Sequence, residues 1–232
     1  MTERDQIITW LLEGDVSIQY QVFRDLLAQE RLDIQNKIST QGWGAAYLSK
    51  RNQEGYWGRG FYQPKWISSH YTLLDLRKLC ISPTTEAARE TIRMIIENEK
   101  GEDGGVNPSA TISQSDICVN GMFLDYATYF EMDQESLKSI VDYIISQQMP
   151  DGGFNCRFNR SGARHGSLHS TISVTEGIAG YLRQGYLYRV NELRDAEASA
   201  REFMLMHQLF RSDKTGEIID TNGYWLLLID TG

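Results

Sequence analysis

The chain has 232 residues, of which 41% are hydrophobic and 23% charged, and its formal net charge is −8. This length and balance suit a globular domain with a real core, and the acidic surplus excludes nucleic acid as an expected partner. Charged residues stand within the first five positions and no long apolar run follows, so neither a signal peptide nor a transmembrane helix is predicted. Three cysteines are too few for a disulfide framework, which favours a cytoplasmic protein.

Helical patterns follow one another along the whole chain. The N-terminal part predicts helices at residues 6–13, 16–29 and 33–50. Beyond it, nearly all-apolar helices alternate with charged, amphipathic ones, in which apolar residues recur at helical spacing. The apolar helices are expected at residues 66–79, 112–130 and 168–184, and the amphipathic helices at residues 84–98, 134–147 and 191–207. No period-2 alternation persists, so we predict an all-α fold.

A glycine-containing loop precedes each apolar helix. Glu54, Asp103 and Asp151 stand directly before a glycine, at spacings of 49 and 48 residues, and a looser copy at Asp213 comes 62 residues later. In such loops Gly supplies a positive φ and Asp makes an Asx turn. Helices that are apolar all round must be buried, so the amphipathic helices should surround them. An open α-solenoid and a closed ring of helical hairpins both satisfy this pattern.

The third loop, residues 148–154, resembles the QxxDGGF/W repeat of squalene and hopene cyclases and of protein-prenyltransferase β subunits. The resemblance implies an α/α toroid, an incomplete six-hairpin barrel, formed by residues 1–232 as one domain. Five stretches are also similar to functionally uncharacterised bacterial proteins of this terpenoid cyclase/protein prenyltransferase superfamily. These stretches are residues 10–27, 62–76, 147–158, 169–177 and 210–220.

The resemblance implies an enzyme that acts on an isoprenoid-like or other apolar ligand. A prenyltransferase-like transferase or a cyclase would fit, although the DxDD motif with which toroid cyclases protonate an alkene is absent from the sequence. Two alternatives stay open. The first is a non-catalytic helical-repeat module that binds a lipid or a peptide, and the second is an inactive, truncated relative.

A zinc site is the most specific chemistry that the resemblance implies. Protein prenyltransferases hold zinc with an Asp-x-Cys pair and a histidine at the starts of inner helices. Asp116, Cys118 and His169 match that pattern, and Cys156 or His165 would be the fourth ligand. Carboxylate, thiolate and imidazole suit catalytic zinc with an open coordination position. Equally, Cys118 would serve as a small buried apolar residue and Asp116 as a helix cap.

Polar and aromatic residues at the starts of the apolar helices form a wider candidate site. In a closed ring His70, Asp116 and His169 would lie at the same end of the barrel and line its cavity. The cavity-lining candidates are Trp66, His70, Tyr71, Ser115, Asp116, Thr171 and Glu176. Helix capping would explain the same polar residues. Asp75, Asp125 and Glu176 lie deeper in these helices and need partners, for which Arg24, Arg77 and Arg157 are candidates.

The last twelve residues, 221–232, match no further repeat. A closed ring needs about a dozen helices, and the sequence predicts nine or ten. We therefore expect a C-terminally truncated ring, whose unclosed apolar edge would favour self-association.

Overall fold

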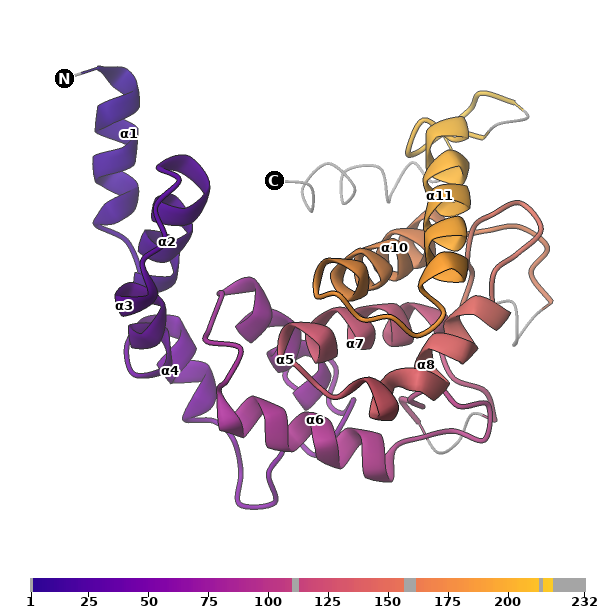
Figure 1. The fold of residues 1–232 in the computed structure, drawn as a ribbon, viewed down its shortest axis with the longest axis horizontal. Coiled ribbons are helices and arrows are strands. Elements are labelled where there is room, and N and C mark those ends of the chain that lie inside the picture. Colours follow the sequence, from indigo (N-terminus) through magenta and orange to yellow (C-terminus); the bar gives the residue numbers. More distant parts are fainter. Residues whose placement is uncertain (1, 110–112, 157–161, 213–214, 219–232) are drawn as a thin grey trace. The chain divides into compact units, whose positions relative to one another are not determined.

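The computed structural model describes residues 2–109, 113–156, 162–212 and 215–218 (Figure 1). These ranges are helical and contain no strand, only isolated bridges that pair Lys100 with Val106 and Arg211 with Ile218. The all-α prediction is therefore confirmed for the described part of the chain. None of its helices combines the length and the apolar character that crossing a bilayer requires. The expected truncation concerns residues 221–232, which lie outside the described ranges.

The chain divides into two compact units. Unit 1 consists of Met1–Glu99 and Tyr126–Met132, and unit 2 of Lys100–Asp125 and Asp133–Gly232. The boundary between the units therefore falls within helix α7 (Ile117–Tyr129). Each unit is described by itself below.

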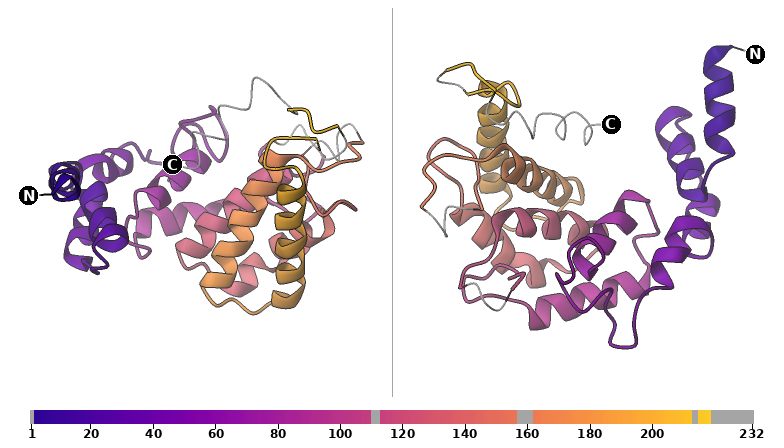
Figure 2. Two further views of the ribbon diagram at one scale, coloured as in Figure 1. Left: turned by 90° about the horizontal axis from the view of Figure 1, so that it is seen from above. Right: turned by 180° about the vertical axis from the view of Figure 1, so that it is seen from behind.

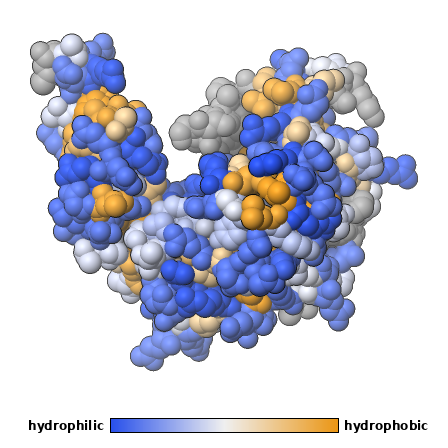
Figure 3. All heavy atoms as spheres, viewed as in Figure 1, coloured by the Kyte–Doolittle hydropathy of each residue, from blue (hydrophilic) through white to orange (hydrophobic). Residues whose placement is uncertain are grey.

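Unit 1 begins with short helical segments. They are α1 (Glu3–Leu12), α2 (Val16–Gln21), a π-helical turn (Val22–Leu26), α3 (Leu32–Gln35), a 3-10 turn (Asn36–Ser39) and α4 (Gly42–Leu48). Helix α1 buries none of its residues and exposes Ile7 and Trp10. Hydrophobic patches are visible over these N-terminal helices on an otherwise largely hydrophilic face (Figure 3).

The continuous helix predicted for residues 33–50 is wrong, because the chain turns between α3 and α4. Gly42 has a φ of 62°, which L-residues rarely adopt, so the helix cannot run through it. Asp15 then fixes the new start: its Oδ1 accepts from Ser17 N at 2.9 Å and its Oδ2 from Trp43 N at 2.9 Å. One carboxylate thus accepts hydrogen bonds from backbone N–H groups in the first turns of both α2 and α4.

The rest of unit 1 contains α5 (Ser69–Lys78) and α6 (Glu86–Asn98). Helix α6 agrees with its predicted range within two residues. Helix α5 starts later than residue 66, because Trp66 has a left-handed φ of 77° and lies outside the helix. Leu73 and Leu76 of α5 and Ile92 and Ile95 of α6 are fully buried, so these two helices contribute the core of the unit.

Unit 2 contains the first part of α7 together with α8 (Gln134–Ser146), α10 (Leu168–Arg183) and α11 (Val190–Met206). Helices α10 and α11 pack side by side (Figures 1 and 2). Helices α7 and α10 approach backbone to backbone, since a Cβ on Gly121 would lie 2.6 Å from Val174 Cα. A Cβ on Gly177 would collide with the carbonyl oxygen of Gly121. The two predicted apolar helices therefore lie against each other.

The three loops repeat the same backbone geometry. Their turn glycines, Gly55, Gly104 and Gly152, have φ values of 85°, 88° and 86°. Two residues later comes a buried residue whose N–H and C=O both hydrogen-bond to one polar side chain in the following helix. The pairs are Trp57 with Ser69, Val106 with Asn120 and Phe154 with Thr171, with N–H to oxygen distances of 3.0, 2.7 and 2.9 Å. We call these three side chains the loop latches.

Aspartates hold two of the loops in the expected Asx turn. Asp103 accepts from Gly105 N at 3.2 Å and from Ser115 N at 2.7 Å. Asp151 likewise accepts from Gly153 N at 3.1 Å and from Gly166 N at 2.7 Å. In the first loop Asn52 replaces the aspartate, because its Oδ1 accepts hydrogen bonds from the backbone N–H groups of residues 54 and 56.

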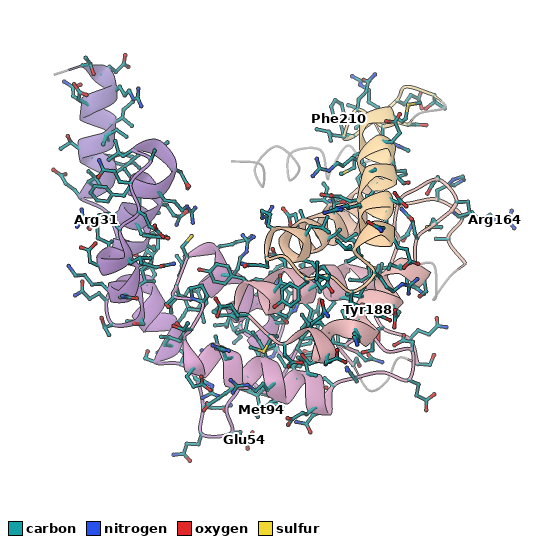
Figure 4. The ribbon with its side chains drawn as sticks, viewed as in Figure 1. Arg31, Glu54, Met94, Arg164, Tyr188 and Phe210 are labelled. Atoms are coloured by element: carbon teal, nitrogen blue, oxygen red, sulfur yellow. The ribbon has the colours of Figure 1, made fainter. Side chains whose placement is uncertain are left out.

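Glu54 itself is exposed at the tip of its loop (Figure 4). Each loop also packs on the second of the two helices that follow it. A Cβ on the turn glycine would approach Met94 of α6, Ser139 of α8 and Ser199 of α11, respectively. The repeating unit is therefore a loop followed by two helices.

Candidate functional site

A pocket of about 520 Å³ opens between α4 and α5 in unit 1. Its volume is typical of small-molecule sites. Seven residues line it: Trp43, Ala46, Tyr47, Lys50, Asp75, Lys78 and Leu79. Their spacing along the chain explains the arrangement, because residues three or four positions apart share one face of a helix. We call this cavity the α4/α5 pocket.

Aromatic and aliphatic side chains form most of the wall of the pocket. The backbone N–H of Trp43 is fixed by Asp15, while its indole remains 54% exposed. The carbonyl of Tyr47 accepts from Trp57 Nε1 at 2.7 Å, which ties the end of α4 to the first loop. An exposed tryptophan on an otherwise anchored helix offers a large apolar surface for a ligand at little entropic cost.

The polar groups of the pocket are one carboxylate, one phenol and two lysines. Tyr47 donates its hydroxyl hydrogen to Asp75 Oδ2 at 2.8 Å. Burial and this hydrogen bond raise the pKa of Tyr47 to about 12, so the phenol stays protonated at neutral pH. Lys50 and Lys78 are exposed at the rim. Asp75 was expected to need an arginine partner, and the structure gives it the Tyr47 hydroxyl instead.

Three predicted cavity-lining residues of unit 1 come together in an aromatic cluster. His70 is fully buried, and its Nδ1 lies 3.3 Å from the Tyr126 hydroxyl. Its ring contacts Tyr62 and Tyr71, with centroids at 5.3 and 5.1 Å, while Trp66 packs on Tyr71 and is 69% exposed. Burial lowers the pKa of His70 to about 3, and its Nε2 has no hydrogen-bond partner among the described residues.

The predicted residues Asp116, Cys118 and Cys156 also come together, in unit 2. Cys156 Sγ accepts from Cys118 N at 3.2 Å and from Ser170 Oγ at 3.4 Å. The pairing with Cys118 and the Ser170 hydroxyl lower the pKa of Cys156, whereas the same pairing and burial raise the pKa of Cys118. Asp116 stands directly before α7 and interacts electrostatically with both sulfurs.

The remaining predicted residues have other surroundings. Ser115 donates its hydroxyl hydrogen to Asp103 Oδ1 at 2.8 Å, and Thr171 is the latch of the third loop. His169 and Glu176 of α10 are exposed. The ring of His165 is also exposed, and its Nδ1 lies 3.8 Å from Asp151 Oδ2.

Among the described residues, no group of three or more His, Cys, Asp and Glu side chains is arranged so that it could hold a metal ion. The zinc site of Asp116, Cys118 and His169, with Cys156 or His165 as the fourth ligand, stays a prediction.

Sequence reasoning missed the α4/α5 pocket. The signal was nevertheless present, because Trp43, Tyr47 and Lys50 follow one another at steps of four and three residues. These residues were predicted as the end of one long helix at residues 33–50. A separate short helix with an exposed tryptophan on one face was therefore not considered.

Comparison with known proteins assigns no family to the chain. The resemblance of its loops to those of terpene cyclases and prenyltransferases rests on the loop residues alone, and it stays a prediction. No family model matches the chain, and no curated protein matches it.

Proposed function

We propose that this chain binds an apolar small molecule with an anionic head group in the α4/α5 pocket. The observation that supports the proposal is the composition of the pocket: a wall of Trp43, Tyr47 and Leu79 with two lysines at its rim. Among the described residues that line it, the one carboxylate is Asp75, and it already accepts a hydrogen bond from Tyr47. An anionic head group would therefore meet two positive charges at the rim, and a carboxylate that is already held by the Tyr47 hydroxyl.

The apolar wall would supply most of the affinity. Burying apolar surface contributes about 25 cal/mol per Å², so covering the exposed indole of Trp43 is worth more than either rim contact. Exposed charges contribute only about 0.2–1 kcal/mol each, because water and salt screen them. The lysines would thus select and orient the head group, while the apolar tail determines how tightly the molecule binds.

An isoprenoid diphosphate has this chemistry, and it connects the pocket to the function that the sequence predicts. We also propose that the repeating units are arranged as an α/α toroid. The equal geometry of the three loops and the close approach of α7 and α10 support this arrangement. The transferase, cyclase and zinc functions stay predictions, because binding alone accounts for the groups that line the pocket.

Calorimetric titration of the whole chain with farnesyl diphosphate tests the binding proposal. We expect saturable binding of one molecule per chain. Trp43→Ala should weaken binding by about tenfold, which corresponds to about 1.4 kcal/mol of lost contact. The matched control is Trp10→Ala, because Trp10 is also exposed but lies on α1 and does not line the pocket.

The head-group part of the proposal has a separate test. Lys78→Glu should weaken the binding of farnesyl diphosphate while leaving the binding of uncharged farnesol nearly unchanged. Absence of binding for both molecules would overturn the proposal, and so would binding that Trp43→Ala leaves unaffected. If Lys78→Glu affected the binding of both molecules equally, the proposed ligand would not need an anionic head group.

A further inference from the structure

Two of the three cysteines are in direct contact in unit 2. Cys118 is the second residue of α7, and Cys156 follows the third loop by two positions. The backbone N–H of Cys118 donates to Cys156 Sγ at 3.2 Å, which brings the two residues into direct contact. The third cysteine, Cys80, belongs to unit 1, where Arg24 Nη1 lies 3.0 Å from its sulfur.

The surroundings of Cys156 favour a nucleophilic sulfur. Its Sγ accepts hydrogen bonds from the first turn of α7 and from the Ser170 hydroxyl. These two contacts place the sulfur of Cys156 against the residue that carries the second thiol, Cys118. Disulfide exchange within one chain needs two cysteines in such contact, one that attacks and one that resolves the mixed disulfide.

We propose that Cys118 and Cys156 form a reversible disulfide on exposure to a low-molecular-weight disulfide such as oxidised glutathione. The bond would fasten the third loop to the start of α7, and so link two successive repeats. Both cysteines are free in the structure, and the bond requires their sulfurs to approach to about 2.05 Å. This proposal is independent of the α4/α5 pocket.

The reaction takes two exchange steps that balance. The Cys156 thiolate attacks one sulfur of the small disulfide, forms a mixed disulfide and releases one small thiolate. Cys118 then loses its proton and attacks the Cys156 sulfur, which expels the second small thiolate. Both cysteine protons end on the two small thiols that leave, and the two electrons that the cysteines lose reduce the small disulfide.

The disulfide would have two physical consequences. It would close a loop between residues 38 positions apart, which restricts the unfolded chain and raises stability. It would also consume both thiols, so any metal that depends on Cys118 and Cys156 would be excluded from the oxidised form.

The test counts thiols in the whole chain before and after incubation with oxidised glutathione. We expect three titratable thiols in the denatured reduced protein and one after oxidation, with a peptide map that joins Cys118 to Cys156. The Cys80→Ser variant should go from two thiols to none. Oxidised wild type should melt about 5–10 °C above the reduced form, and dithiothreitol should reverse the change.

The Cys118→Ser variant identifies the attacking sulfur. It should stop at a mixed disulfide with glutathione on Cys156, whereas Cys156→Ser should stay unmodified at Cys118. If a variant fails to fold, the peptide map of the oxidised wild type still shows whether Cys118 is joined to Cys156. Three unreacted thiols would overturn the proposal, as would disulfides only between chains. Stoichiometric zinc that blocks oxidation until a chelator removes it would also overturn it.

Discussion

Gly121 and Gly177 determine how closely α7 and α10 approach. The nearest atoms to a Cβ at either position belong to the backbone of the facing helix: Val174 Cα for Gly121, and Gly121 O for Gly177. A backbone atom cannot move aside as the end of a flexible side chain can, so any larger residue here must separate the helices. The close approach therefore needs glycine at both sites, although glycine weakens a helix by about 1 kcal/mol relative to alanine.

Gly121→Ala should therefore destabilise the protein. We expect the free energy of unfolding, measured with urea, to fall by about 1–3 kcal/mol, despite the better helix propensity of alanine. Ala179→Ser is the matched control, since it adds one atom at a half-buried position of α10, and it should change stability by less than about 0.5 kcal/mol. A Gly121→Ala variant as stable as wild type would contradict the close packing.

Single residues were partly predictable from the sequence. The zinc pattern that the resemblance implies named Cys156, or alternatively His165, as a fourth ligand beside Cys118, and the structure brings Cys118 and Cys156 into contact. The polar residues at the helix starts were harder to interpret, because a cavity lining and a structural latch use the same residue types. Thr171 holds the backbone of Phe154, a role that depends on where the loop returns and not on local pattern.

At the scale of elements, the latches explain why each loop needs a polar residue in an otherwise apolar helix. The latched residues Trp57, Val106 and Phe154 are buried, so their backbone N–H and C=O groups have no access to water. A buried backbone group without a partner costs about 1–3 kcal/mol. One side chain with a donor and an acceptor satisfies both groups at once.

Thr171→Val tests the latch with little change of shape. It removes the hydroxyl that accepts from the buried Phe154 N at 2.9 Å, whereas Phe154 O keeps its bond from Ser167 N at 2.7 Å. Because Phe154 N is left without a partner, urea unfolding should show a loss of about 1–3 kcal/mol. Thr175→Val, one turn later, removes only a bond to the carbonyl of Thr171 within the helix and should cost clearly less. Equal losses in the two variants would mean that the loop does not depend on its latch.

Helix boundaries followed the sequence best in the C-terminal half of the chain. The predicted ranges 134–147, 168–184 and 191–207 agree with α8, α10 and α11 within one residue. The helix predicted at residues 33–50 is divided instead, because a contact distant in sequence decides where α4 begins. Asp15 caps α2 and also accepts a hydrogen bond from Trp43 N, 28 residues away. A local pattern of apolar residues cannot predict such a hydrogen bond.

At the scale of the molecule, His70 links folding to pH. It is enclosed by aromatic rings, and burial lowers its pKa to about 3 in the folded state. In the unfolded chain the pKa is about 6.5. Below pH 6.5 the unfolded chain takes up a proton at this histidine while the folded chain does not. The stability that the neutral imidazole contributes is therefore present above pH 6.5 and is lost as the pH falls towards 3.

The loss should be about 1.36 kcal/mol per pH unit, which amounts to about 2 kcal/mol between pH 7 and pH 5. His70→Phe removes the titrating group and keeps an aromatic ring in the cluster. Between pH 7 and pH 5 the free energy of unfolding of this variant should therefore fall by about 2 kcal/mol less than that of the wild type. Carboxylates and the other histidines contribute to both proteins alike, and the difference between the two slopes isolates His70. Urea unfolding followed by circular dichroism at the two pH values measures it. Identical slopes would mean that the folded protein accommodates a charged His70, and the enclosed aromatic cluster would then have to open in acid.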